Sequence, residues 1–183
     1  QWWAHQVIGA RMQGATLLSE TLAQYTALMI MKKEFGEEMM HKFLRYEMNN
    51  YLRSRGLERM KERPLLNVDP NQGYIHYQKG SLAIYYLTEM IGESRVNAAL
   101  KELIDAYAYK GPPYPSSHEL VDRLKKHTPP DLQYLIKDLF EEITIFDNRT
   151  LEAKVTAAGD AKFKVALEIE CHKWKADEKG RET

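Results

Sequence analysis

A single charged residue, Glu20, lies in the twenty-residue stretch Met12–Met31, although Asp, Glu, Lys and Arg make up 28% of the chain. At the 100° spacing of an α-helix, one face of this stretch collects four large apolar side chains: Leu18, Leu22, Tyr25 and Met29. Glu20 falls on the opposite side, which is also apolar, so the pattern predicts a helix that is buried all round. Because an unpaired buried carboxylate costs several kcal/mol, we expect a cation, a proton or a metal ion beside Glu20.

The composition is that of one domain of ordinary size without a strong overall charge. A chain of 183 residues is long enough to bury a core of its own. Lys plus Arg and Asp plus Glu number 26 each, so no net field attracts nucleic acid, and we expect no nucleic-acid partner. The single Cys171 excludes an internal disulfide scaffold and leaves the compartment open. Polar residues inside Met12–Met31 argue against a transmembrane segment there.

Glycine stop signals and proline-rich turns divide most of the chain into helices. Gly36, Gly56 and Gly92 each follow a segment with helical periodicity, as glycine typically does at a helix C-terminus. Prolines, asparagines and a closing glycine predict a loop over residues 57–72. The predicted helices cover residues 15–35, 37–55, 74–91, 94–109, 116–126 and 129–142.

The periodicity changes in the last part of the chain. Residues 151–156 and 163–169 alternate apolar and polar side chains around Ala158-Gly159-Asp160, which predicts a β-hairpin. Since two strands alone are only marginally stable, we expect this hairpin to begin a following β-domain. The predicted fold is therefore mainly α over residues 1–147, with a C-terminal β-hairpin in residues 148–183.

Three short segments carry the functional signal: Gln1-Trp2-Trp3, Leu18 to Tyr25 and Tyr77-Gln78-Lys79-Gly80. Together they resemble the gluzincin zinc aminopeptidases, the family typified by aminopeptidase N. In that family a His-Glu-x-x-His helix is followed by Gln and an aromatic pair. A second helix then supplies a Glu zinc ligand in a sequence like Asn-Glu-Gly-Phe-Ala-x-Tyr, and a Tyr-Glu-Lys-Gly motif follows. The resemblance is closest to peptidase domains joined to bacterial ABC-transporter permease segments.

The resemblance implies the helical half of a thermolysin-like metallopeptidase catalytic domain. It places Glu20 at the position of a zinc ligand, with Thr21 where the family has Gly, and Tyr77 at the position whose hydroxyl stabilises the oxyanion during peptide hydrolysis. The parent protein would hydrolyse peptides as an aminopeptidase, with zinc as cofactor. The His-Glu-x-x-His motif itself is absent from the 183 residues, so we expect the chain to begin just after it. Alone, the chain is expected to bind no zinc and to be inactive, and its main partner would be the rest of the parent catalytic domain.

Each assignment has a structural alternative. Glu20 would be an ordinary helix carboxylate if it paired with a neighbouring arginine such as Arg11, and Tyr77 would be ordinary if it only filled the core. For the whole chain, the alternative is a non-catalytic helical interaction module or a degenerate peptidase homologue. An apolar face near Trp2 and Trp3, left open without the rest of the domain, would favour self-association.

Overall fold

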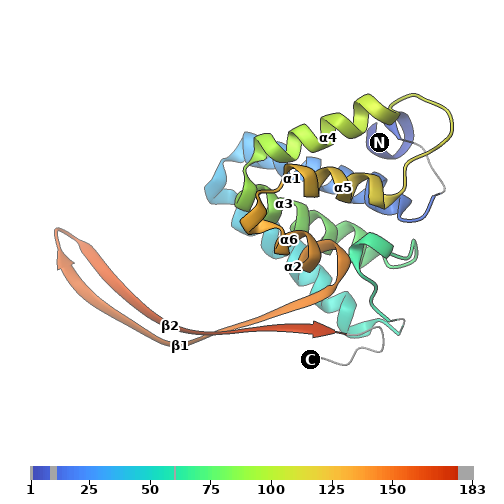
Figure 1. Cartoon of the computed structure of the whole chain (residues 1–183). Helices are drawn as coiled ribbons and strands as arrows, with labels where there is room; N and C mark the ends of the chain where they lie inside the picture. The colour runs from blue at the N-terminus through green and yellow to red at the C-terminus, as the bar shows by residue number, and fades with distance from the viewer. Residues whose placement is uncertain (1, 9–11, 60, 177–183) are drawn as a thin grey trace. The chain divides into compact units, whose positions relative to one another are not determined.

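The predicted change from helix to strand is present in the computed structural model of the chain, which describes residues 2–8, 12–59 and 61–176. Two units are distinguished, Gln1–Ile143 and Thr144–Thr183. The first is helical and the second is a two-stranded antiparallel hairpin (Figure 1). A mainly α fold with a C-terminal β-hairpin is therefore confirmed.

The elements follow the predicted order along the chain. The α-helices are α1 (Leu22–Phe35), α2 (Glu37–Leu57), α3 (Gly80–Ile91), α4 (Glu93–Tyr107), α5 (Ser117–His127) and α6 (Tyr134–Ile136). Turns of π-helix form η1 (Trp2–Val7), η2 (Leu17–Thr21), η4 (Tyr74–Lys79) and η6 (Lys137–Glu141), and 3₁₀-turns form η3 (Leu65–Asn67) and η5 (Pro130–Leu132). The strands are β1 (Ile143–Gly159) and β2 (Lys162–Ala176).

Two of the predicted stop glycines end helices in the expected way. Gly36 and Gly92 have φ of 80° and 91°, a region that L side chains rarely adopt, so α1 and α3 cannot continue through them. Gly56 instead lies inside α2, which ends one residue later at Leu57. The predicted helix over residues 129–142 is divided into η5, α6 and η6.

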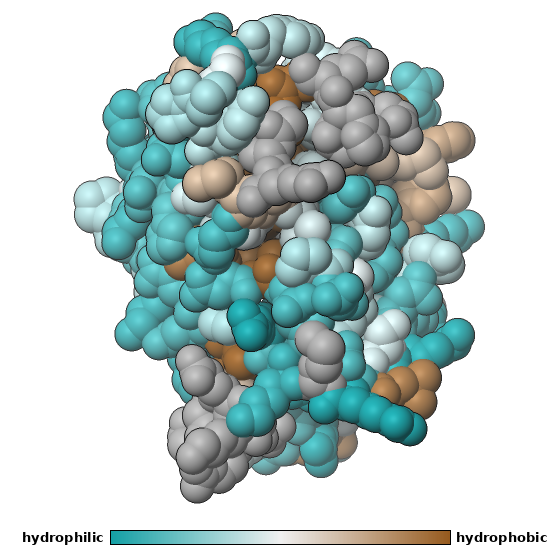
Figure 2. Space-filling model, turned by 90° about the vertical axis from the view of Figure 1, so that its right-hand side faces the viewer, coloured by the Kyte–Doolittle hydropathy of each residue, from teal (hydrophilic) through white to brown (hydrophobic). Residues whose placement is uncertain are grey.

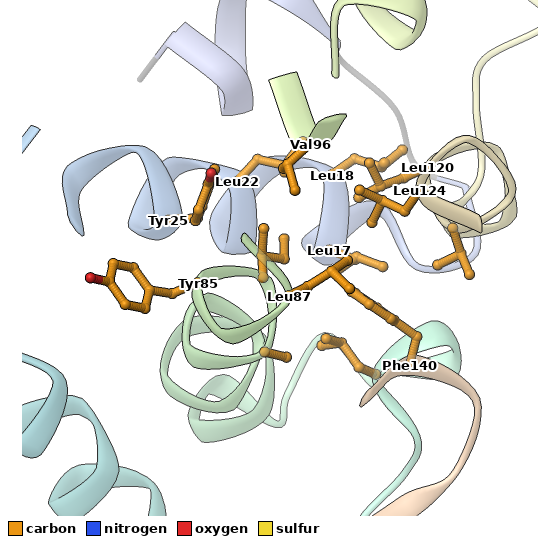
Figure 3. Close-up of a cluster of buried hydrophobic side chains, with 14 of the residues drawn as sticks. Leu17, Leu18, Leu22, Tyr25, Tyr85, Leu87, Val96, Leu120, Leu124 and Phe140 are labelled. Carbon is orange, nitrogen blue, oxygen red and sulfur yellow. The ribbon is translucent and has the colours of Figure 1, made fainter. Parts of the chain in front are cut away.

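The core of the helical unit gathers around η2 and α1. Leu17, Leu18 and Leu22 are buried, and Figure 3 shows them beside Leu87 of α3 and Leu120 of α5. Fully burying one such leucine contributes about 1.5–3 kcal/mol, so this cluster is a main source of stability. Helices α4 and α5 pack side by side against the same core (Figure 1).

The expectation that the helix around Glu20 is buried on every side is wrong. Ala27 is exposed, Ile30 is 56% exposed and Glu20 is half-buried. The reason is that the described helices pack against the Leu22 side, which leaves the Glu20 side at the surface. Figure 2 shows another view of the surface, on which hydrophilic side chains predominate and apolar ones form small, separate patches.

The hairpin turns through Asp160 and Ala161, whose φ values of 49° and 57° suit a two-residue turn between right-twisted strands. Both strands are longer than predicted because pairing continues through residues 143–150, where apolar and polar residues do not alternate regularly. The large apolar side chains of the hairpin are exposed, including Leu151, Val155, Phe163, Val165, Leu167 and Ile169.

In the ranges that the structure describes, no helix has both the length and the apolar character needed to cross a membrane.

Candidate functional site

Glu20 and Tyr77, which the sequence singles out separately, meet in the folded chain. The Tyr77 hydroxyl donates a hydrogen bond to Glu20 Oε2 at 2.6 Å, across a sequence separation of 57 residues. This distance is in the range of hydrogen bonds between a hydroxyl and a carboxylate. Glu20 lies in η2 and Tyr77 in η4, and π-helical turns of this kind occur frequently at functional sites.

Close packing of the two π-helical turns makes this contact possible. Thr21 Oγ1 donates a hydrogen bond to the His76 carbonyl, which ties η2 directly to the backbone of η4. A Cβ atom on Gly80 would lie only 2.6 Å from Thr21 Oγ1, so a larger residue could not occupy this position without moving the helices apart. The absence of a side chain at Gly80 therefore allows η2 and η4 to approach closely.

The hydrogen bond to Glu20 fixes the protonation state of Tyr77. This bond, followed by partial burial, raises the pKa of the Tyr77 phenol to about 12, so the phenol is a neutral donor at physiological pH. The side chain is 36% exposed. Tyr77 is thus not an ordinary core residue, because its hydroxyl lies at the accessible surface beside a carboxylate.

His76 supports Tyr77 from the buried side. The two rings lie 4.6 Å apart between centroids, and His76 Nε2 lies 3.3 Å from the Pro70 carbonyl oxygen, which requires a proton on that nitrogen. Burial lowers the pKa of the His76 imidazole, although the Pro70 carbonyl and Glu20 act in the opposite direction. A neutral His76 with its proton on Nε2 fits both observations.

Behind the site lies a buried carboxylate that sequence reasoning missed. Glu47 of α2 is 5% exposed, and Gln24 Nε2 donates a hydrogen bond to its Oε1 at 2.8 Å. The side chain of Gln78 also interacts with this carboxylate. Burial raises the pKa of Glu47, and the two neutral amides, which act in the opposite direction, do not outweigh it. The available signal was the inward stripe of α2, on which Glu47 stands between Met40 and Tyr51.

A second buried carboxylate, Glu62, lies on the other side of η4. It pairs with Lys79 and with Arg55 Nε at 2.7 Å, and it accepts a hydrogen bond from the Tyr51 hydroxyl at 3.1 Å. Burial alone would raise the pKa of Glu62, but Lys79 and Arg55 outweigh it and hold the pKa below its usual range. Sequence reasoning placed this residue in a polar loop, where nothing indicated its partners.

The residues present can offer a metal ion one ligand. Glu20 is a half-buried carboxylate, and its hydrogen-bond donor in the described part of the chain is the neutral Tyr77. Gln1 and the alternative partner Arg11 lie outside the described residues. Within residues 2–8, 12–59 and 61–176, no three His, Cys, Asp or Glu side chains are grouped so that they could hold a metal ion. Glu20 fits zinc as a carboxylate ligand, while a complete zinc site needs further ligands.

Comparison with protein-family models, with curated proteins and with solved structures finds no match to this chain. The case for a function therefore rests on the motifs and on the geometry of Glu20 and Tyr77.

Proposed function

We propose that this chain is part of a zinc-dependent metallopeptidase, an aminopeptidase by its resemblance to the gluzincins, that hydrolyses peptide bonds with metal-activated water. Glu20 is the zinc ligand and Tyr77 is the catalytic residue that donates to the oxyanion. The observation that carries the proposal is the 2.6 Å hydrogen bond between them, because two motifs far apart in the sequence meet as a peptidase site requires.

The surroundings of Glu20 suit a metal ligand. A carboxylate paired to Arg or Lys would have its charge already neutralised, whereas the described donor to Glu20 is a neutral phenol. Zinc, when bound, supplies a Lewis acid that activates water and polarises the peptide carbonyl. The other two ligands and the general base would belong to a His-Glu-x-x-His helix elsewhere in the parent protein.

Tyr77 suits the stabilisation of developing negative charge. Its phenol stays protonated at neutral pH because of its raised pKa of about 12, and it adds no charge that would repel or bind a peptide carboxylate. When a substrate is present, this donor would turn from Glu20 to the oxygen that becomes negative. Losing a donor of this kind typically raises the barrier by about 2.7–4 kcal/mol.

The apolar surface on the exposed side of α1 supports the proposal that this chain is one part of a larger catalytic domain. Ala27 and Ile30 of α1 lie on the same exposed side as Glu20 of the preceding η2, and such apolar surface is where the rest of a thermolysin-like catalytic domain would pack. The hairpin would then begin the β-domain that follows, and the parent would belong with peptidases joined to bacterial transporter permeases.

Zinc analysis of the full-length parent tests the proposal. We expect one zinc per chain in the unsubstituted protein and after Tyr77→Phe, but less than a tenth of that after Glu20→Ala. Glu34→Ala, on an exposed glutamate of the same helix, is the matched control and should keep its zinc. Zinc that survives Glu20→Ala would exclude Glu20 as a ligand. A parent without a His-Glu-x-x-His motif would instead support the non-catalytic helical module.

A further inference from the structure

We infer that Glu47 is a positioning residue that holds Glu20 and Tyr77 within hydrogen-bonding distance of each other. The catalytic meaning of this role rests on the proposed function, but the contact that Glu47 maintains can be measured without zinc or substrate.

The evidence is the placement of the two residues that bind Glu47. Gln24 follows Glu20 by one helical turn, and Gln78 directly follows Tyr77 in the sequence. Gln24 donates to Glu47 Oε1 at 2.8 Å, and the Gln78 side chain also interacts with the carboxylate and lowers its pKa. One buried side chain of α2 therefore lies between α1, which directly follows the turn that carries Glu20, and the turn that carries Tyr77. Helix α2 packs against both α1 and η4, so it provides a common support.

The two site residues need such a support. They come from two separate π-helical turns, 57 residues apart in the sequence, so their separation is set by tertiary contacts. A displacement of about 1 Å between reacting groups is enough to lower a catalytic rate strongly. A contact that couples α1 to η4 next to both residues would prevent that displacement.

Glu47 is also a poor choice for a core residue that has only a packing role. Its described neighbours supply amide donors and no cation, and its Oε2 has no hydrogen-bond partner among the described residues. An apolar residue of similar volume would be expected to fill this place at least as well. Local exceptions of this kind are expected where a residue serves function.

Glu62 provides the matched comparison. It is also buried and also binds η4, through Lys79, but its other partners, Arg55 and Tyr51, belong to α2. Glu62 therefore anchors the turn that carries Tyr77 to α2 and, among the described residues, not to α1. If coupling between the two site helices is what matters, the two carboxylates must differ in their effect on the Tyr77–Glu20 hydrogen bond.

The test is the Tyr77–Glu20 hydrogen bond itself, followed at pH 7 by NMR of tyrosine labelled with ¹³C at the ζ position, whose chemical shift responds to hydrogen bonding of the phenol. Tyr77→Phe assigns the Tyr77 signal, and Glu20→Ala gives its chemical shift without the hydrogen bond. We expect Glu47→Ala to move the Tyr77 shift toward the Glu20→Ala value, Glu47→Gln to move it less, and Glu62→Gln to leave it unchanged.

An unchanged Tyr77 chemical shift in folded Glu47→Ala would overturn the inference, as would an equal change in Glu62→Gln. If Glu47→Ala does not fold, Gln24→Ala removes the same bridge at a half-buried position, and the Tyr77 shift must again move toward the Glu20→Ala value. Failure of the proposed function would be seen separately, because it concerns zinc content and peptide hydrolysis rather than this hydrogen bond.

Discussion

Glu47 and Glu62 anchor consecutive residues of the same π-helical turn, Gln78 and Lys79, but they do so by different chemistry. Glu62 is matched by the cations of Lys79 and Arg55, and its pKa is held below the usual range. Glu47 is matched by neutral amides, and burial raises its pKa. The pKa values of these two buried carboxylates are thus shifted in opposite directions, because the cations beside Glu62 outweigh its burial and the amides beside Glu47 do not.

Because of this difference, we expect Glu62 to contribute mainly to the stability of the helical unit and Glu47 mainly to the geometry of the site. Removing one partner of a buried ion pair leaves an uncompensated charge, so the Glu62 cluster should carry a large share of the local stability. A carboxylate bound only by amides leaves no stranded charge when it is neutralised, so Glu47 should matter less for stability than for the placement of Glu20 and Tyr77.

The largest expected effect is that of Glu62→Ala on stability. It leaves Lys79, whose side chain is 13% exposed, without its carboxylate, and we expect the free energy of unfolding to fall by about 3–5 kcal/mol. Urea denaturation followed by circular dichroism measures this change.

The control for this loss is Lys101→Ala, which breaks the exposed pair with Asp105 and should change stability by less than about 1 kcal/mol. If Glu62→Ala costs no more than Lys101→Ala, then Glu62 is not an anchor, and the contrast with Glu47 disappears.

A smaller effect, on the order of 1 kcal/mol, is expected in the pH dependence of stability for Glu62→Gln and Glu47→Gln. Because the folded-state pKa of Glu62 is lowered, the stabilisation that Glu62 contributes is complete above the usual pKa of 4.5. It is lost as the pH falls through the lowered folded-state pKa. The folded-state pKa of Glu47 is raised, so its carboxylate opposes folding as the pH rises above 4.5 and has no such effect below it.

Urea denaturation at pH 3.5, 5 and 7.5 distinguishes these two opposite pH dependences of stability. Relative to the unsubstituted chain, Glu62→Gln should lose most stability at pH 7.5 and least at pH 3.5. The free energy of unfolding of Glu47→Gln, relative to that of the unsubstituted chain, should increase as the pH rises from 5 to 7.5. The same sign for both variants would mean that the pKa values of the two carboxylates are not shifted in opposite directions.

The sequence predicts the helical framework well because its signals are local. Gly36 and Gly92 end helices through backbone conformations that only glycine adopts easily. The stripe through Leu18 and Leu22 predicts the buried face of η2 and α1, and both residues are buried. The same helix was wrongly expected to be buried on the Glu20 side, because periodicity shows which side chains share a face but not which faces are covered.

The site is less accessible to sequence reasoning because it depends on contacts between distant segments. The motifs point to Glu20 and Tyr77, but the π-helical turns that bring them together leave no periodic pattern in so few residues. Glu62 stands in a segment with loop composition, and its pairing with Lys79 spans 17 residues and an intervening turn. No helical or strand periodicity links two residues at this separation.

The central claim, that Tyr77 and Glu20 form a metallopeptidase site, is tested most directly by steady-state kinetics of Tyr77→Phe in the full-length parent. Because the hydroxyl is needed chiefly when charge develops on the carbonyl oxygen, we predict that kcat falls by about a hundredfold or more, while KM stays within a few-fold and zinc content is unchanged. Excess zinc should restore part of the activity of Glu20→Ala and none of that of Tyr77→Phe. A Tyr77→Phe enzyme with unchanged kcat would remove Tyr77 from the mechanism and contradict the proposed site.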